Sequence, residues 1–178
     1  MIQFTSRHGD SWSPGAATWE AEMYAALLTA VVTWIAANFD LPRDFDHPQV
    51  KLVPAVEITL LRYQAFTPAQ RHDVPSSPRE IAAGTQRREV VAVYDDRSKT
   101  VFLPDTWTGA TPADLSVLVH EMVHHLQNSA HMKYECPGAR EQLAYAAQDK
   151  WLKLFGRDLA SEFDIDAFTL KVTTTCGF

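Results

Sequence analysis

The chain has 178 residues, of which 46% are hydrophobic and 21% charged, and its formal net charge is -6 at pH 7. This composition is ordinary for a soluble globular protein, and the length suits a single domain over residues 1–178 with a hydrophobic core. Nucleic-acid-binding proteins usually present a basic face, so the acidic balance predicts no nucleic-acid partner. The two cysteines form no CxxC pair, which excludes a zinc ribbon.

The N-terminal part predicts an arm followed by a long helix. Residues 1–15 are polar and contain Gly, Pro and Ser, which is typical of a flexible arm. A helix is expected over Thr18–Asn38, before a proline at position 42. Within it, Met23–Phe39 is uncharged and reaches the lower limit of a membrane span. Its large apolar residues recur at helical spacing on one side, so we expect a core helix and no membrane span.

Two features bear on the compartment. Glu20 and Glu22 precede the apolar run, where a secretory signal would carry basic residues, so the chain shows no signal peptide. An extracytoplasmic location would require that a signal had been removed from a precursor. Cys136 and Cys176 either remain two buried thiols or form a disulfide, which would imply an oxidising compartment.

The middle of the chain predicts short strands and one helix. The expected elements are a strand at Val50–Val53, a helix beginning at Pro54, a loop at 67–84 and a β-hairpin at Glu89–Leu103. The hairpin would pair Val90–Tyr94 with Thr100–Leu103 through a turn at 95–98. Four arginines flank or occupy the loop, where we expect a solvated face: Arg71, Arg79, Arg87 and Arg88.

The C-terminal third predicts two consecutive helices and a tail. Thr111 suits an N-cap, Pro112 the first helical position and Asp114 the acidic third position of a helix that runs to about Asn128. A second helix is expected over Gly138–Phe155. The tail, 158–178, is amphipathic at first and then Thr-rich, which indicates an extended end. The predicted fold class is therefore α+β.

The first of these two helices contains the stretch LVHEMVHHLQ at 118–127. His120 and His124 are four residues apart, so a helix places both imidazoles on one face, where they can hold one zinc ion. Glu121 lies beside them and is suited to accept a proton from metal-activated water. This is the HExxH pattern of zinc-dependent hydrolases. The alternative is a structural helix with incidental histidines.

A catalytic zinc ion takes three protein ligands and keeps one open position. No histidine follows at the offset of an HExxHxxGxxH motif, so the third ligand must come from further along the chain. The candidates are His131, Glu135 and Glu141. Glu141 fits best because it begins the next helix in an apolar setting, whereas the other two lie in the connecting loop. A solvated glutamate in the first helical turn is the alternative reading.

On these motifs, residues 87–155 resemble small bacterial zincin-like metallopeptidase domains of the Glu-zincin, thermolysin-like type. In that group an HExxH helix is completed by a glutamate on the next helix. The resemblance implies a minimal zincin-like fold, with His120, His124 and Glu141 as ligands of one zinc ion and Glu121 as the general base. It also implies that an extended peptide docks along the hairpin.

The chain departs from the larger enzymes of that group in two ways. They carry an acid one turn after the glutamate ligand, and here that position is Tyr145. The contact that orients a zinc histidine must then come from Gln148, Asp149 or a backbone carbonyl. The C-terminal half-domain is absent, and with it the histidine that those enzymes use beside the developing oxyanion.

Other residues near the HExxH motif could support the proposed site. Tyr134 and His131, in the loop after the metal helix, are the candidate donors to an oxyanion. His125 points away from His124 and is expected to be a packed or hydrogen-bonded histidine. Trp107 is expected to pack or to line the mouth of a cleft. Cys136 has no placement that would support a nucleophile.

The sequence thus predicts a zinc metallopeptidase with a peptide or protein substrate. Two alternatives stay open: a zincin-like domain that binds zinc or peptide without cleaving, and a zinc amidase that acts on a non-protein amide. Retention of Glu121 favours hydrolysis over binding alone. A purely structural zinc site is disfavoured because such sites usually have four protein ligands rich in cysteine.

Overall fold

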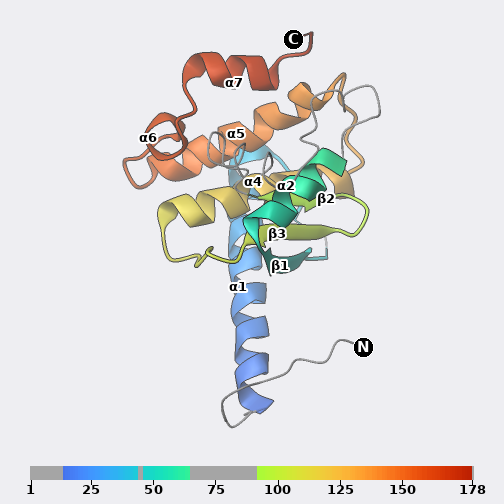
Figure 1. The fold of residues 1–178 in the computed structure, drawn as a ribbon, viewed down its shortest axis with the longest axis vertical. Coiled ribbons are helices and arrows are strands. Elements are labelled where there is room, and N and C mark those ends of the chain that lie inside the picture. The colour runs from blue at the N-terminus through green and yellow to red at the C-terminus, as the bar shows by residue number, and fades with distance from the viewer. Residues whose placement is uncertain (1–13, 44–45, 65–91, 178) are drawn as a thin grey trace.

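The computed structural model describes residues 14–43, 46–64 and 92–177, and these residues form an α+β fold (Figure 1). The elements are α1 (Pro14–Phe39), β1 (Gln49–Val53), α2 (Ala55–Gln64), β2 (Val93–Asp95), β3 (Thr100–Pro104), α4 (Pro112–Ser129), α5 (Pro137–Lys153), α6 (Leu159–Phe163) and α7 (Ala167–Thr174). In Figure 1 the sheet, α4, α5 and α7 follow one another in layers, with α4 between the sheet and α5.

The sheet has the strand order β1-β3-β2. β2 and β3 form the predicted antiparallel hairpin, with Tyr94 opposite Val101. The turn is fixed by Asp95, whose carboxylate accepts hydrogen bonds from the backbone N–H groups of Arg97 and Ser98. β1 adds to β3 in parallel, a pairing that the sequence did not predict. The hairpin therefore becomes part of a mixed sheet, with β1 and β2 at its edges.

α4 is the central helix of the fold. Its predicted start is confirmed: the Thr111 side chain accepts from the backbone N–H of Asp114, and Pro112 occupies the first turn. Every residue from 116 to 127 is buried, because the sheet, α1 and α5 surround this helix. Gly109, in the approach to α4, has a positive φ of 67°, and a Cβ there would lie 2.7 Å from the Trp107 ring. Glycine is therefore required where the chain turns over Trp107.

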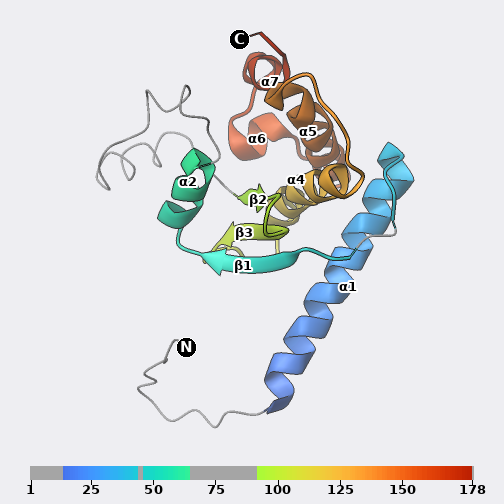
Figure 2. The same ribbon diagram turned by 90° about the vertical axis from the view of Figure 1, so that its right-hand side faces the viewer.

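α1 begins four residues earlier than expected, at Pro14, so residues 14 and 15 belong to the helix and not to an arm. The predicted apolar stripe is largely confirmed, since Leu28, Val31, Val32 and Ile35 are buried in the same core cluster as α4. Figure 2 shows that the N-terminal half of α1 extends beyond the rest of the body. In the described parts of the chain, Glu22–Phe39 is the one helical stretch long and apolar enough to cross a membrane by length and composition.

The C-terminal segment differs from the predicted extended end. After Leu154 the chain forms two short helices, α6 and α7, whose N-caps are Asp158 and Asp166. The hydroxyls of Thr173 and Thr174 bond to carbonyls four residues earlier, so the Thr-rich stretch continues the helix. Packing against α5 overrides the strand preference of these β-branched residues.

A disulfide joins Cys136 to Cys176, as one of the two sequence alternatives proposed. It connects the N-cap of α5 to the end of α7 across 40 positions of sequence. Three predictions lie outside the described residues: the arm before residue 14, the loop at 67–84 with the four arginines in or beside it, and the first part of the hairpin at 89–91.

Candidate metal centre

His120, His124 and Glu141 come together in the structure. Each offers a ligand atom, and these atoms lie within 4.8 Å of one another. The Glu141 Oε2 atom lies 3.2 Å from the His120 Nε2 atom, and the Glu141 Oε1 atom lies 3.3 Å from the His124 Nε2 atom. Two imidazole nitrogens and a carboxylate form a donor set that zinc takes in catalytic sites. The three residues could therefore hold a metal ion.

Close packing of α5 on α4 brings Glu141 to the histidines. Ala144 and Ala147 are fully buried, and their small side chains allow the two helices to approach. Arg140, the neighbour of Glu141, forms a bidentate ion pair with Asp96 in the turn between β2 and β3, with N···O distances of 2.9 and 2.7 Å. The first turn of α5 is thus connected to the hairpin as well as to α4.

Two buried glutamines fix the imidazole tautomers. The Gln148 Oε1 atom lies 3.0 Å from the His120 Nδ1 atom, and the Gln127 Oε1 atom lies 3.0 Å from the His124 Nδ1 atom. An amide oxygen only accepts, so each Nδ1 atom carries the proton and donates it. Each Nε2 atom, the one facing Glu141, then presents its lone pair to a metal ion.

The glutamines are themselves held in the orientation that this requires. The Gln127 side-chain NH2 donates to the Arg140 carbonyl at 3.0 Å. The Gln148 NH2 donates to the Ser116 hydroxyl, whose own proton goes to the Ala113 carbonyl. The sequence singled out Gln148, and the structure places it there. Gln127 was not predicted from the sequence, although its position three residues after His124 places it on the same helical face.

The electrostatics of the three residues are strongly coupled. Burial alone would raise the pKa of Glu141, but hydrogen bonds and charge from His120 and His124 hold it far below its usual range. Burial likewise would lower the pKa of His124, yet the hydrogen bond and charge of Glu141, with the charge of Glu121, raise it overall. The two imidazoles therefore stabilise the charged form of Glu141.

Glu121 is 7% exposed and lies on α4 beside His120, close enough for its charge to act on both His124 and Tyr145. Tyr145 lies one turn after Glu141 on α5. Its ring contacts the His120 ring edge to face, with centroids 4.7 Å apart and an interplanar angle of 74°. The position that departs from the larger enzymes is thus filled by an aromatic ring packed on His120.

The candidate residues of the loop between α4 and α5 lie outside the group formed by His120, His124 and Glu141. His131 is exposed and adopts a left-handed conformation just after α4, with φ 52°. Glu135 is exposed in the same loop. The Tyr134 hydroxyl donates to the Met132 sulfur at 3.3 Å. Asp149, the other residue considered for orienting a histidine, pairs with Lys153 and accepts from the Leu159 N–H.

His125 and Trp107 have structural contacts. The His125 Nε2–H donates to the Asp46 carbonyl at 2.8 Å, and its Nδ1 atom accepts from the Tyr94 hydroxyl at 3.1 Å. Burial lowers the pKa of His125, which keeps it neutral in this role. Trp107 is buried, and its indole N–H donates to the Asp114 carbonyl at 2.9 Å.

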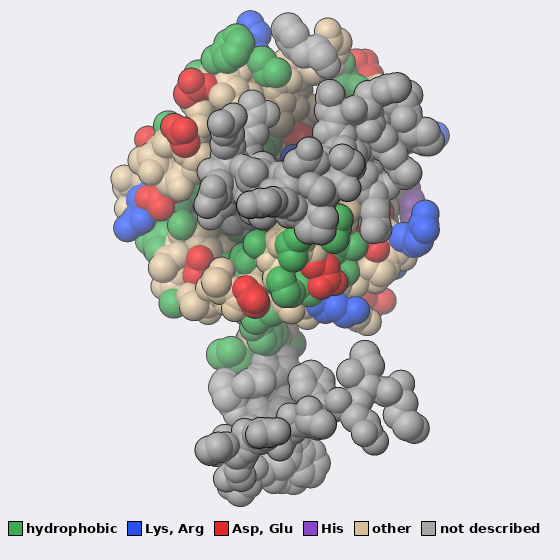
Figure 3. Space-filling model, in the orientation of Figure 1, with side chains coloured by type: hydrophobic (Ala, Val, Ile, Leu, Met, Phe, Trp, Pro, Cys, Tyr) green, Lys and Arg blue, Asp and Glu red, His purple; other side chains and the backbone are tan. Residues whose placement is uncertain are grey.

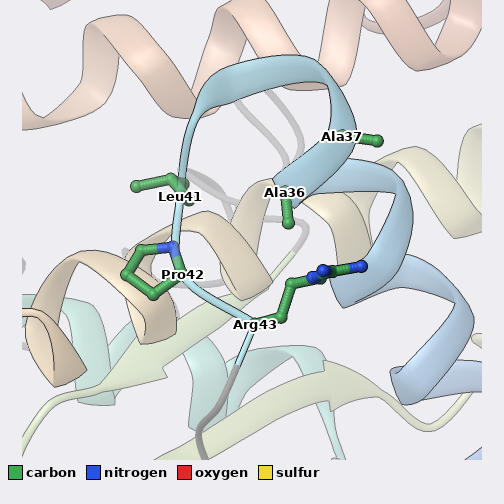
Figure 4. Close-up of a pocket in the computed structure, with 5 residues that line it drawn as sticks. All are labelled: Ala36, Ala37, Leu41, Pro42 and Arg43. Carbon is green, nitrogen blue, oxygen red and sulfur yellow. The ribbon is translucent and has the colours of Figure 1, made fainter.

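A hollow of about 400 Å³ at the C-terminal end of α1 is lined by Ala36, Ala37, Leu41, Pro42 and Arg43, none of which is a candidate ligand (Figure 4). The face seen in Figure 3 carries acidic and basic side chains interspersed, with apolar side chains between them.

Comparison with known proteins gives one family. Residues 20–177 match the family described as "Domain of unknown function (DUF6647)". The matched span contains every candidate ligand, both glutamines and both cysteines. No curated protein and no solved structure matches the chain.

Proposed function

We propose that this chain, which by its match over residues 20–177 belongs to the DUF6647 family, is a zinc-dependent metallopeptidase. One observation carries the proposal: the HExxH histidines and Glu141 present three ligand atoms within 4.8 Å of one another. The buried glutamines behind the histidines support it, because they leave each Nε2 atom free to bind a cation. Two histidines and one carboxylate leave room for a water, as catalytic zinc sites require.

The resemblance to Glu-zincin metallopeptidases supports the choice of zinc and of peptide hydrolysis. The donors in the group are imidazole and carboxylate, with no thiolate, which is the set used by zinc hydrolases of that type. When bound, zinc would polarise the scissile carbonyl and acidify a water molecule.

The chain's own residues would then move the protons. Glu121 would accept a proton as the water oxygen attacks the scissile carbon, and would pass that proton to the amine as the C–N bond breaks. Its low exposure supports this role, because a carboxylate in a largely water-free setting exchanges its proton with the reactants and not with bulk solvent.

Zinc content and peptide cleavage test the proposal together. Wild type, Glu141→Ala and Glu121→Gln are purified without added metal, and zinc is measured by elemental analysis. We expect about one zinc per chain in wild type and in Glu121→Gln, and little in Glu141→Ala. In a peptide-library screen, Glu121→Gln should cleave roughly 100- to 10,000-fold more slowly than wild type.

Glu135→Ala is the matched control, since it removes an acid from the adjacent loop. Loss of zinc in Glu135→Ala in place of Glu141→Ala would overturn the ligand assignment. A wild type that takes up no zinc even after soaking would overturn the metal site. Zinc binding without any cleavage would leave a binding domain or an amidase for a different amide as the function.

A further inference from the structure

Amide hydrolysis of the proposed kind needs a hydrogen-bond donor for the oxygen that becomes negative. As the water oxygen bonds to the carbonyl carbon, the π electrons of the C=O bond move onto this oxygen, and a fixed donor beside it lowers the barrier. The donors expected from the sequence, Tyr134 and His131, are a loop tyrosine bonded to the Met132 sulfur and an exposed residue after α4.

Tyr145 occupies the side of the ligand group formed by α5. It follows Glu141 by four residues, so both side chains project from one face of that helix. Its ring lies against His120, with 4.7 Å between the ring centroids, so the phenol lies beside a candidate ligand. The side chain is half-buried and remains reachable from solvent, as a group that meets a substrate must be.

Tyr145 has the chemistry of a donor, because its phenol carries an O–H group that can donate a hydrogen bond. The contact of its ring with His120 places this phenol at the candidate metal centre.

We propose that the Tyr145 hydroxyl donates a hydrogen bond to the oxyanion of the tetrahedral adduct, an inference that rests on the proposed function. Tyr145 keeps its proton throughout. The proton of the water goes to Glu121 and from there to the departing amine, while collapse of the adduct breaks the C–N bond and returns the oxyanion's electron pair to the C=O bond. The tyrosine would thus supply the oxyanion donor of the proposed reaction.

Tyr145→Phe is the test, because it removes the hydroxyl and keeps the ring against His120. The first measurement is anion binding to the cobalt-substituted protein, in which inorganic phosphate mimics the tetrahedral anion and is titrated by the cobalt absorption spectrum. We expect unchanged metal content and phosphate binding about 10- to 100-fold weaker than in wild type. The second is cleavage of a quenched-fluorescent peptide library, where kcat should fall on the order of 100-fold or more with little change in KM.

Tyr24→Phe, on α1, is the control for loss of a tyrosine hydroxyl, and Tyr134→Phe tests the rival donor. Equal phosphate affinity in wild type and Tyr145→Phe, or a loss confined to Tyr134→Phe, would overturn the role of Tyr145. Wild type that binds metal but cleaves no peptide would count against the proposed function itself. Cleavage that Tyr145→Phe leaves unaffected would overturn the inference alone.

Discussion

α5 is held on two opposite sides by different means. Toward α4 it presents Glu141, Ala144, Ala147 and Gln148, which make polar contacts or pack tightly around the candidate metal centre. Toward α7 it is joined by the Cys136–Cys176 disulfide, and Gly138 lies against the Thr173 and Thr175 carbonyls. The contacts toward α4 position the side chains of the candidate metal centre, and the contacts toward α7 fix the backbone of α5. Changes on the two sides should therefore separate metal binding from stability.

The largest expected effect is on the disulfide side. The double variant Cys136→Ser/Cys176→Ser removes the crosslink and keeps a good N-cap for α5, since serine is among the preferred N-cap residues. Closing a 40-residue loop constrains the unfolded chain, so the free energy of unfolding should fall by about 4 kcal/mol. Denaturant unfolding of the metal-free protein measures this. Zinc content should stay at the wild-type value, and its loss would show that the two sides are not independent.

Overpacking the α4 side is the next largest change. Ala147→Leu inserts a large side chain where α5 is fully buried against α4, and it should cost about 1–3 kcal/mol of stability while displacing Glu141 from the histidines. Zinc content should fall with it. Ala146→Leu is the matched control, because Ala146 is exposed on the same helix. Equal stability and equal zinc content of the two variants would contradict the close approach of α4 and α5.

A smaller effect is expected when a ligand keeps its place but loses its support. Gln148→Ala removes the acceptor for the His120 Nδ1–H, and zinc affinity should weaken by about 10- to 100-fold. Competition with a zinc-binding dye measures the change. Gln142→Ala changes an exposed glutamine six residues earlier on α5 and should leave the affinity as it is. If both variants bind zinc like wild type, the glutamine is not needed to orient His120.

The smallest effect concerns pH in the metal-free protein. The raised pKa of His124 gives stability that is complete below its ordinary value of 6.5 and is lost as pH rises through the folded-state pKa. The lowered pKa of Glu141 gives stability that is complete above 4.5 and is lost as pH falls. The contribution of this pair to stability should thus be greatest between pH 4.5 and 6.5 and should fall toward pH 8, and thermal unfolding measures it. Glu141→Gln should flatten this maximum, and an unchanged profile would argue against the pairing.

The parts that the sequence predicted are those with local signals. The start of α4 follows from Thr111, Pro112 and Asp114, whose capping chemistry acts within one turn. The grouping of His120 with His124 follows from helical periodicity. Glu141 was chosen on its apolar setting, and the structure brings it to the histidines. Its role as a zinc ligand remains a prediction.

The parts that the sequence did not predict depend on distant contacts. The parallel pairing of β1 with β3 joins residues about 50 positions apart, and no local pattern selects that partner. Gln127 is an unremarkable polar residue until Arg140, on the next helix, orients its amide. In the sequence, Tyr145 indicates only that an acid is replaced. The contact of its ring with His120 depends on the packing of α5 against α4. The helical end of the tail likewise depends on α5.

The disulfide also determines what a cut in the chain would do. Any single cut between residues 136 and 176 leaves both fragments covalently joined through Cys136 and Cys176. The segment between α5 and α6 includes the exposed Leu154 and Phe155, and so offers a protease an accessible stretch. A molecule nicked there would migrate as the intact chain on a non-reducing gel and would separate into two pieces only after reduction.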